Sequence, residues 1–318
     1  MIVAAAAVLV VVLIALAYAT YRRDIDRAFA RISTGSQVAQ TPCGPIEYAT
    51  AGAGKPLLVV HGAGGGFDQG MDLAKYLTAG LRVIAMSRFG YLRTPLPADA
   101  SATAQADAHA CLLDALGVRR AAIVGASAGA PSSMQFALRY PERCTALVLL
   151  VPAAFVPRPA GAASMKSPTR AEFLVDTVFK SNFLFWASIT LARPWMIESI
   201  LATPLDVVRR ANAEEQARAV QMLEHMLPIS PRRSGLANDI AVVSALSRYA
   251  LENIEAPTLV IGFADDRFGT YDIARYTAEH IPGARFIAYR SGGHVAVGHQ
   301  TDVMAKIAGF LTAAGSGR

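Results

Sequence analysis

Between residues 57 and 289 the chain alternates short apolar runs with longer segments whose apolar residues follow helical spacing. Runs without polar interruption are typical of parallel strands that are covered on both faces. The runs that we assign to strands are residues 57–60, 82–86, 121–124, 146–151, 258–261 and 285–289. Helical spacing in 101–116, and a helix-like segment at 131–140, separate some of these runs. The pattern predicts an α/β fold with a mostly parallel central sheet flanked by helices.

The alternation stops between residues 153 and 237, where apolar helical stretches follow one another and are broken by Pro194 and Pro204. We predict a helical cap at 153–237, inserted into a core made of residues 41–152 and 238–318. The stretches are rich in Phe, Trp, Met and Leu. They are consistent with an apolar substrate pocket, with ordinary core packing or with a face that lies against a membrane.

The first 18 residues carry no charge, which is enough apolar helix to cross a bilayer. Residues 1–20 are therefore predicted to be a transmembrane anchor, with a cleaved signal segment as the alternative because 17–19 has a small-x-small pattern. Residues 21–40 are predicted to form an amphipathic stalk helix. Arginines follow the apolar run and none precedes it, which favours a catalytic domain on the cytoplasmic face. Cleavage would instead give a secreted or periplasmic protein.

Charge and cysteine content exclude several classes of function. The net charge of +6 comes from 30 Lys and Arg against 24 Asp and Glu, and the basic residues are scattered, so nucleic-acid binding is not indicated. Cys43, Cys111 and Cys144 are odd in number and widely spaced, without a zinc-binding pattern. We predict that all three are reduced, and that the protein needs no metal or cofactor.

The segment Gly125-Ala126-Ser127-Ala128-Gly129 lies between a predicted strand and a predicted helix. A nucleophilic serine needs a sharp turn of this kind, with small residues two positions before and after it so that the flanking elements do not collide. The N–H groups at the start of the following helix favour negative charge close to Ser127. The segment predicts a serine nucleophile.

With this turn the sequence resembles the α/β-hydrolase superfamily from about residue 41 to the C-terminus. The resemblance implies an α/β-hydrolase fold with a helical cap, and the predicted N-terminal hydrophobic helix lies outside the part of the chain that it covers. It also identifies His61-Gly62-Ala63-Gly64-Gly65-Gly66 as an oxyanion loop. The predicted oxyanion donors are the backbone N–H of Ala128 and that of Ala63 or Gly64.

One loop departs from the superfamily pattern. Relatives often carry an acidic residue followed by P-G-x-G-x-S, whereas this chain has Ser87 in place of the acid and Phe89 in place of the proline. We expect the departure to affect the wall of the pocket more than the chemistry.

The order serine, acid, histidine along the chain agrees with that of the superfamily. His294 follows two glycines and is the predicted general base, with His299 as a weaker alternative. Asp265 and Asp266 follow the strand at 258–261, and either can supply the acid. Counting back from residue 281 favours Asp266, while counting forward from Gly262 favours Asp265. We predict Asp266 and keep Asp265 as the alternative.

These residues predict a serine hydrolase, of the carboxylesterase type, that cleaves an ester of a small or apolar substrate through an acyl-enzyme. One alternative is hydrolysis of a carbon–carbon bond in a ring-cleavage product, because the cap and triad resemble those enzymes equally well. A second is a protein of the same fold that binds a small ligand without turnover. The expected partners are the small-molecule substrate and a membrane.

Overall fold

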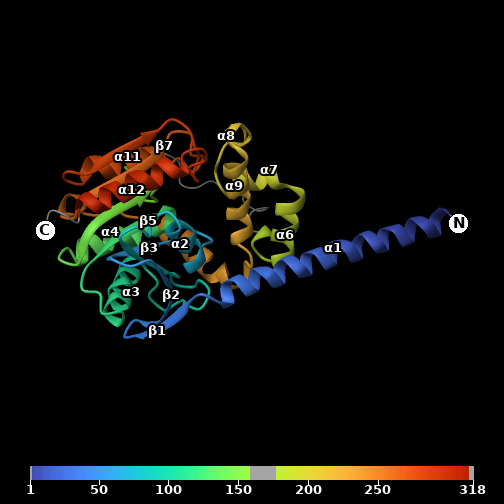
Figure 1. Ribbon diagram of the computed structural model, residues 1–318, viewed down its shortest axis with the longest axis horizontal. Coiled ribbons are helices and arrows are strands. Elements are labelled where there is room, and N and C mark those ends of the chain that lie inside the picture. The colour runs from blue at the N-terminus through green and yellow to red at the C-terminus, as the bar shows by residue number, and fades with distance from the viewer. Residues whose placement is uncertain (1, 158–176, 315–318) are drawn as a thin grey trace.

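The computed structural model describes residues 2–157 and 177–314 (Figure 1). At its centre is an eight-stranded sheet with the order β1-β2-β4-β3-β5-β6-β7-β8. The strands are β1 Gln37–Thr41, β2 Gly44–Ala51, β3 Lys55–Val60, β4 Leu81–Met86, β5 Ala121–Ala126, β6 Cys144–Leu150, β7 Thr258–Phe263 and β8 Arg285–Tyr289. β2 is antiparallel to both neighbours, and all the other pairs are parallel. The predicted α/β fold class is confirmed.

Helices cover both faces of the sheet because its central strands are apolar on both sides. In β3, Leu58 and Val60 pack with one set of helices while Leu57 and Val59 pack with the other. This is the period-two alternation of a strand. The first face carries α3 Ala102–Ala115, α4 Ala130–Arg139 and α11 Thr270–His280, and the second carries α2 Phe67–Ala74 and α12 Gln300–Ala314.

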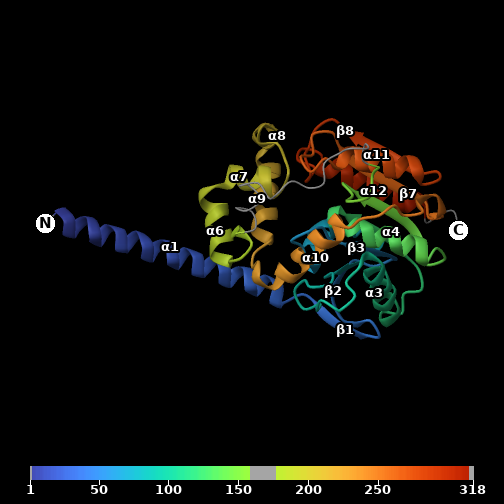
Figure 2. The ribbon, with the colours of Figure 1, turned by 180° about the vertical axis from the view of Figure 1, so that it is seen from behind.

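A layer of short helices lies between the sheet domain and the N-terminal helix, and Figure 2 shows it from behind. Its members are α6 Asn182–Leu191, α7 Arg193–Ser199, α8 Leu205–Arg210 and α9 Ala213–His225. It fills the predicted cap, of which residues 158–176 lie outside the described residues. α10, Arg233–Ser244, crosses the predicted boundary at residue 237, so no break in secondary structure marks the return to the core. The described residues also contain three 3₁₀ turns: Ser127–Gly129, Ser230–Arg232 and Leu251–Asn253.

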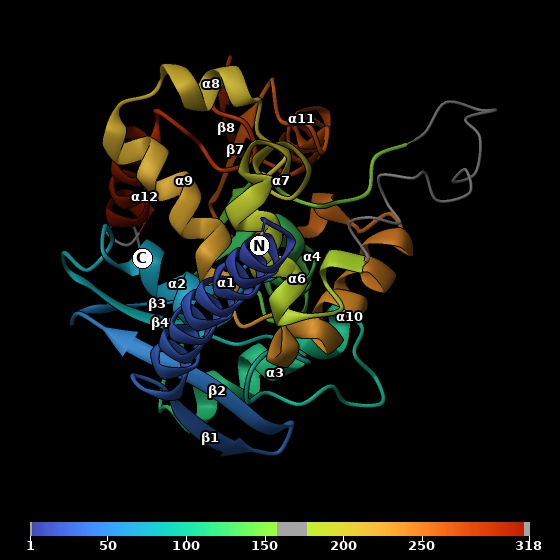
Figure 3. The same cartoon turned by 90° about the vertical axis from the view of Figure 1, so that its right-hand side faces the viewer.

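The N-terminal helix α1 is continuous from Ile2 to Ser33 and projects from the body with the N-terminus at its far end (Figure 1). Figure 3 looks along it and shows the cap helices around its base. Its apolar part is long and hydrophobic enough to cross a membrane, and none of that window is buried. An anchor and a signal sequence both have these properties. The predicted 21–40 stalk extends too far, because the helix ends at Ser33 and residues 37–41 pair with β2 as an edge strand.

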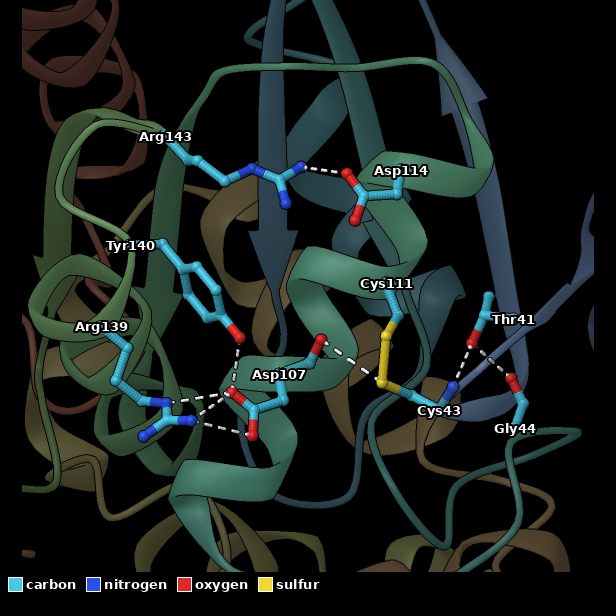
Figure 4. The surroundings of a disulfide bond; sticks show 9 residues. All are labelled: Thr41, Cys43, Gly44, Asp107, Cys111, Asp114, Arg139, Tyr140 and Arg143. Carbon is cyan, nitrogen blue, oxygen red and sulfur yellow. Dashed lines mark hydrogen bonds and ion pairs between the residues drawn. A yellow bond between two sulfur atoms is a disulfide. The ribbon is translucent and has the colours of Figure 1, made fainter.

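Cys43 and Cys111 form a disulfide (Figure 4). Cys43 lies in the turn between β1 and β2, and Cys111 lies on α3, which packs against that edge of the sheet. Their Cα atoms are 6.1 Å apart, within the range that a disulfide bridges. The prediction that all cysteines are reduced is wrong for these two, because wide spacing along the chain says nothing about distance in the fold. Cys144 is buried and takes no part in a disulfide.

Candidate active site

Ser127 lies at the end of β5, where the chain turns sharply into α4. Its φ of 49° is positive, which is rare for a residue with a side chain and typical of a serine held up at such a turn. A Cβ added to Gly125 would lie 2.4 Å from the Oγ of Ser133, and one on Gly129 would lie 2.6 Å from the carbonyl oxygens of Val60 and His61. Only glycine fits at these two positions, as the sequence pattern predicts.

The imidazole of His294 bridges Ser127 and Asp266. Its Nε2 lies 2.9 Å from the Ser127 Oγ, and its Nδ1 lies 2.7 Å from the Asp266 Oδ2. The three residues follow β5, β7 and β8, so parallel pairing places them together beyond the carboxyl ends of the strands. His294 has only 10% of its side chain exposed and Asp266 has none.

The two candidate acids have different partners. Besides His294, the Asp266 carboxylate accepts hydrogen bonds from the Phe268 N–H, at 2.9 Å, and from the hydroxyl of Thr270. Asp265 instead accepts from the backbone N–H groups of Gly292 and Gly293, at 3.2 and 2.8 Å. Asp266 is therefore the carboxylate that contacts the imidazole. Asp265 holds the loop on which that imidazole is carried.

The sequence suggests two backbone N–H groups of the loop after β3 as oxyanion donors, those of Ala63 and Gly64, and the structure distinguishes between them. The N–H of Gly64 is already bonded to the Tyr91 Oη, at 3.1 Å. For the Ala63 N–H there is no partner within the described part of the chain, and Ala63 is exposed. Ala128 directly follows the serine, in the first turn of the helical segment, where N–H groups point away from the helix. The geometry favours Ala63 with Ala128 as the donor pair.

A buried ion pair between Arg88 and Asp239 contacts the backbone of this loop. The two terminal nitrogens of Arg88, Nη1 and Nη2, donate to the Asp239 carboxylate at 2.6 and 2.7 Å, and its Nε–H donates to the carbonyl of His61 at 2.9 Å. Asp239 also accepts from the Tyr91 hydroxyl at 2.5 Å. Burial, with Asp239 adding to it, holds the pKa of Tyr91 well above its usual value, so the phenol stays protonated.

His61 belongs to the same support and stays neutral. Its Nε2 accepts from the N–H of Arg88 at 3.0 Å, so its Nδ1 carries the proton and donates to the carbonyl of Gly62 at 2.7 Å. Burial, reinforced by the charge of Arg88, holds the pKa of His61 well below its ordinary value. Its role in this geometry is to fix the loop.

A second buried arginine holds the other end of the loop. Arg232 has a fully buried side chain that donates to the carbonyl of Gly65 and pairs with the Asp68 carboxylate at 2.7 Å. Asp68 is on α2, directly after the loop, and it also lies 3.5 Å from the Nε of Arg31 on α1. The N-terminal helix is thereby connected to the base of the oxyanion loop.

The cap packs closely on the loops of the site. A Cβ at Gly293 would lie 2.4 Å from the Thr203 Oγ1, and one at Gly64 would lie 2.3 Å from the Met226 methyl group. A cavity of about 500 Å³ lies between α10 and the segment before α3, and Ser127 does not line it. The apolar pocket suggested by the cap sequence stays a prediction.

No sequence pattern predicts the buried residues that hold the loop after β3. Arg88 and Asp239 are 151 positions apart and have no motif in common, so no local signal could pair them. Ser87 and Phe89, the two departures from the superfamily pattern, were expected to affect the pocket wall, but both make buried contacts around the sheet. Ser87 is buried, donates to Glu47 at 2.9 Å and accepts from the N–H of Phe67, while Phe89 packs in the core. Ser87 thus joins β2 to the start of α2, while Phe89 packs on the face of the sheet that carries α3, α4 and α11.

The α/β-hydrolase family model, described as the alpha/beta hydrolase fold, matches residues 55–298. The chain belongs to this family. It is 29% identical over 267 residues to a 2-hydroxy-6-oxononadienedioate/2-hydroxy-6-oxononatrienedioate hydrolase of Paraburkholderia phymatum, which covers 78% of this chain and 84% of the relative.

Two solved structures illustrate the likeness of fold. An alpha/beta hydrolase fold protein from Nakamurella multipartita has a TM-score of 0.69 and 26% identity, and covers 88% of this chain and 99% of that one. A membrane phospholipase A has a TM-score of 0.65 and 20% identity, and covers 98% of this chain and 97% of that one. The second match is long enough to include most of α1.

Within residues 2–157 and 177–314, no group of three or more His, Cys, Asp or Glu side chains is arranged to hold a metal ion.

Proposed function

We propose that this hydrolase uses Ser127 as nucleophile, His294 as general base and Asp266 as the carboxylate that orients the base. The observation that carries the proposal is the bridge made by His294, with hydrogen-bond distances of 2.9 Å to Ser127 and 2.7 Å to Asp266. The N–H groups of Ala63 and Ala128 are the proposed oxyanion donors. Each such donor is worth roughly 3–4 kcal/mol of transition-state stabilisation in comparable chemistry.

The proposed reaction begins when the Ser127 Oγ adds to a substrate carbonyl carbon while its proton passes to the Nε2 of His294. The carbonyl oxygen becomes negative and accepts from the two backbone N–H groups. The tetrahedral centre then collapses and expels the leaving group, which takes the proton from His294. Water attacks the resulting acyl-enzyme through the same base and restores the serine hydroxyl.

For the bond that is cleaved, we propose a carbon–carbon bond next to a ketone, as in a ring-cleavage product. The support is the similarity to a relative named as a 2-hydroxy-6-oxononadienedioate hydrolase, over most of both chains. In such a substrate the leaving carbon takes its electron pair into a conjugated carbonyl system, so the same triad can serve. The amino-acid sequence alone favours an ester as the substrate, and the similarity to this relative reverses that order.

Ester hydrolysis is the second candidate, and the pairing of arginines near the site favours it. A dienedioate carries two carboxylates that would need cationic partners. Arg88 and Arg218 contact the loops of the site, and Arg267 directly follows Asp266. Each of the three is paired with a carboxylate, at 2.6, 2.8 and 2.9 Å respectively. A neutral ester makes no such demand.

Labelling of the folded protein with a fluorophosphonate tests the nucleophile. We expect modification at Ser127, and none in Ser127→Ala, while Ser133→Ala serves as a serine control on α4, the helix that follows the turn. Failure of the wild-type protein to react would favour the non-catalytic ligand-binding alternative. A side-by-side assay of p-nitrophenyl esters and a vinylogous diketone acid then distinguishes the two bonds. Turnover of the esters alone would contradict the carbon–carbon proposal.

We also propose that α1 is a retained membrane anchor. The candidate cleavage site at 17–19 lies inside the helix, and Tyr21, two residues beyond it, packs against Phe183 and Trp186 of the cap with ring centroids 5.1 and 5.5 Å apart. Carbonate extraction of membranes checks this: an anchored protein stays in the pellet, and a cleaved one is released.

The Cys43–Cys111 disulfide indicates on which side of the membrane the catalytic domain lies. Disulfides persist in oxidising compartments and are rare in the cytosol. The arginines after the apolar run favour the cytoplasmic side, but the excess of positive charge in cytoplasmic segments is only a statistical tendency. A disulfide, in contrast, requires an oxidising compartment in order to persist. We therefore propose that the catalytic domain lies on the non-cytoplasmic face. Accessibility of the domain to added protease in intact spheroplasts tests the orientation.

A further inference from the structure

The base of α1 is built into the cap. Ile25 and Ala28 are buried in the same hydrophobic cluster as the cap side chains of α6, α7 and α9. The indole N–H of Trp186 donates to the Asp24 carboxylate at 3.1 Å. Arg31 donates to the carbonyls of His225 and Leu227, at the end of α9. Because α1 is one continuous helix from Ile2 to Ser33, no loop separates its exposed apolar part from the residues that pack in the cap.

Aromatic rings gather where α1 leaves the cap. The ring centroids of Tyr18 and Tyr21 are 6.4 Å apart. The Tyr21 ring in turn packs edge-on against the rings of Phe183 and Trp186. Exposed arginines, Arg22 and Arg23, follow at once. Tyr and Trp are enriched at the level of the lipid headgroups, and basic residues next to a span are attracted to anionic lipids. The cluster therefore has the composition of a membrane–water boundary.

The surface of α6 beside this cluster is apolar and exposed. Phe183, Leu184 and Leu191 are 44%, 40% and 84% exposed. Residues 182–192 contain no charged side chain. α6 lies next to α1 in all three ribbon views and has direct contacts with it (Figures 1 to 3). We call Phe183, Leu184 and Leu191 the α6 patch.

The length of α1 fixes the height of this patch. Residues 2–20 form about 28 Å of helix, close to the thickness of a hydrocarbon core of about 30 Å. A bilayer that holds this part of α1 ends at the aromatic cluster, beside the α6 patch. We propose that the α6 patch lies in the headgroup region of an anionic lipid bilayer, so that the cap is a second membrane contact. The proposal rests on the membrane anchor proposed above.

The chain contains natural probes for this contact. Its two tryptophans, Trp186 and Trp195, are both in the cap. The full chain would be reconstituted into vesicles of phosphatidylcholine and phosphatidylglycerol, with or without bromine atoms on the lipid chains near the headgroup. Bromine quenches tryptophan only at close range. We expect lower emission in the brominated vesicles, and the same loss in Ser127→Ala because the contact does not depend on turnover.

Paired variants make the result specific. Leu184→Asp combined with Leu191→Asp should lose most of the quenching, because carboxylates are expelled from the apolar side of the interface. Ile240→Asp is the matched control, since Ile240 is an exposed apolar residue, 69% accessible, on α10. Circular dichroism confirms that each variant is folded, and carbonate extraction confirms that α1 is inserted.

Two outcomes would overturn the proposal. One is an inserted, folded protein whose emission is the same in brominated and plain vesicles. The other is quenching that persists in the double variant. A cross-linked dimer formed through Leu191→Cys, without quenching in the wild type, would assign the α6 patch to a second copy of the chain. None of these fluorescence and cross-linking results depends on fluorophosphonate labelling, so they test the membrane contact independently of the proposed catalytic residues.

Discussion

The hydroxyl of Tyr91 links Asp239 to the oxyanion loop: it donates to Asp239 at 2.5 Å and accepts from the N–H of Gly64 at 3.1 Å. One phenol thus connects a buried carboxylate of α10 to the backbone beside Ala63. The Gly64 N–H is occupied by this bond, so it serves the loop by fixing its shape.

Tyr91→Phe should lower kcat by between about 10- and 100-fold with a smaller change in KM, because small misplacements of catalytic groups have effects of that size. The Gly64 N–H would lose its acceptor, at a cost of about 1–3 kcal/mol in stability. Steady-state kinetics and denaturant unfolding measure the two effects. Tyr140→Phe is the matched control, since it removes a Tyr–Asp hydrogen bond, to Asp107 (Figure 4), at the end of α4 opposite to Ser127. Equal losses in both variants would contradict the positioning role.

The two neighbouring aspartates should respond differently to amidation. Asp266→Asn leaves the shape nearly intact but favours the wrong tautomer of His294, so we expect kcat to fall roughly 10⁴-fold. Asp265→Asn retains an oxygen for one of the two glycine N–H groups, and we expect roughly a 10-fold loss from a looser loop. Comparison of kcat for the two variants is the measurement. A larger loss in Asp265→Asn would show that the hydrogen-bond pattern has been assigned to the wrong carboxylate.

The sequence could predict those parts of the molecule whose signals are local. Apolar runs locate the strands, and Gly125 and Gly129 mark the serine turn because backbone crowding leaves no other choice. The ambiguity between Asp265 and Asp266 could not be removed by counting, since a one-residue shift depends on how β7 ends. The contact of Arg88 with Asp239 and the Cys43–Cys111 disulfide join segments far apart in sequence. Only tertiary packing brings such pairs together.

The disulfide should contribute about 2–4 kcal/mol to the free energy of unfolding, because it closes a long loop in the unfolded chain. Alkylation of the denatured protein should modify one thiol, Cys144, before reduction and three after it. The double variant Cys43→Ser and Cys111→Ser should unfold at lower urea concentration, with no further change on addition of reductant. Cys144→Ser is the control, and its stability should still depend on reductant. Three reactive thiols in protein isolated without reductant would contradict the pairing and the orientation inferred from it.

Two buried histidines should make the protein less stable in mild acid. Burial lowers the pKa of His61 well below 6.5, and that of His109 to about 3. Below pH 6.5 the unfolded chain takes up protons at both residues while the folded chain does not, so the free energy of unfolding falls as the pH falls. Each histidine should contribute about 1.4 kcal/mol per pH unit once the unfolded form is protonated. Urea unfolding between pH 7 and pH 5 measures the slope. His109→Gln can keep a hydrogen bond to Ser132 and should remove one histidine's share of the slope. A stability that is constant over this range, or that rises as the pH falls, would mean that these histidines are not held neutral in the fold.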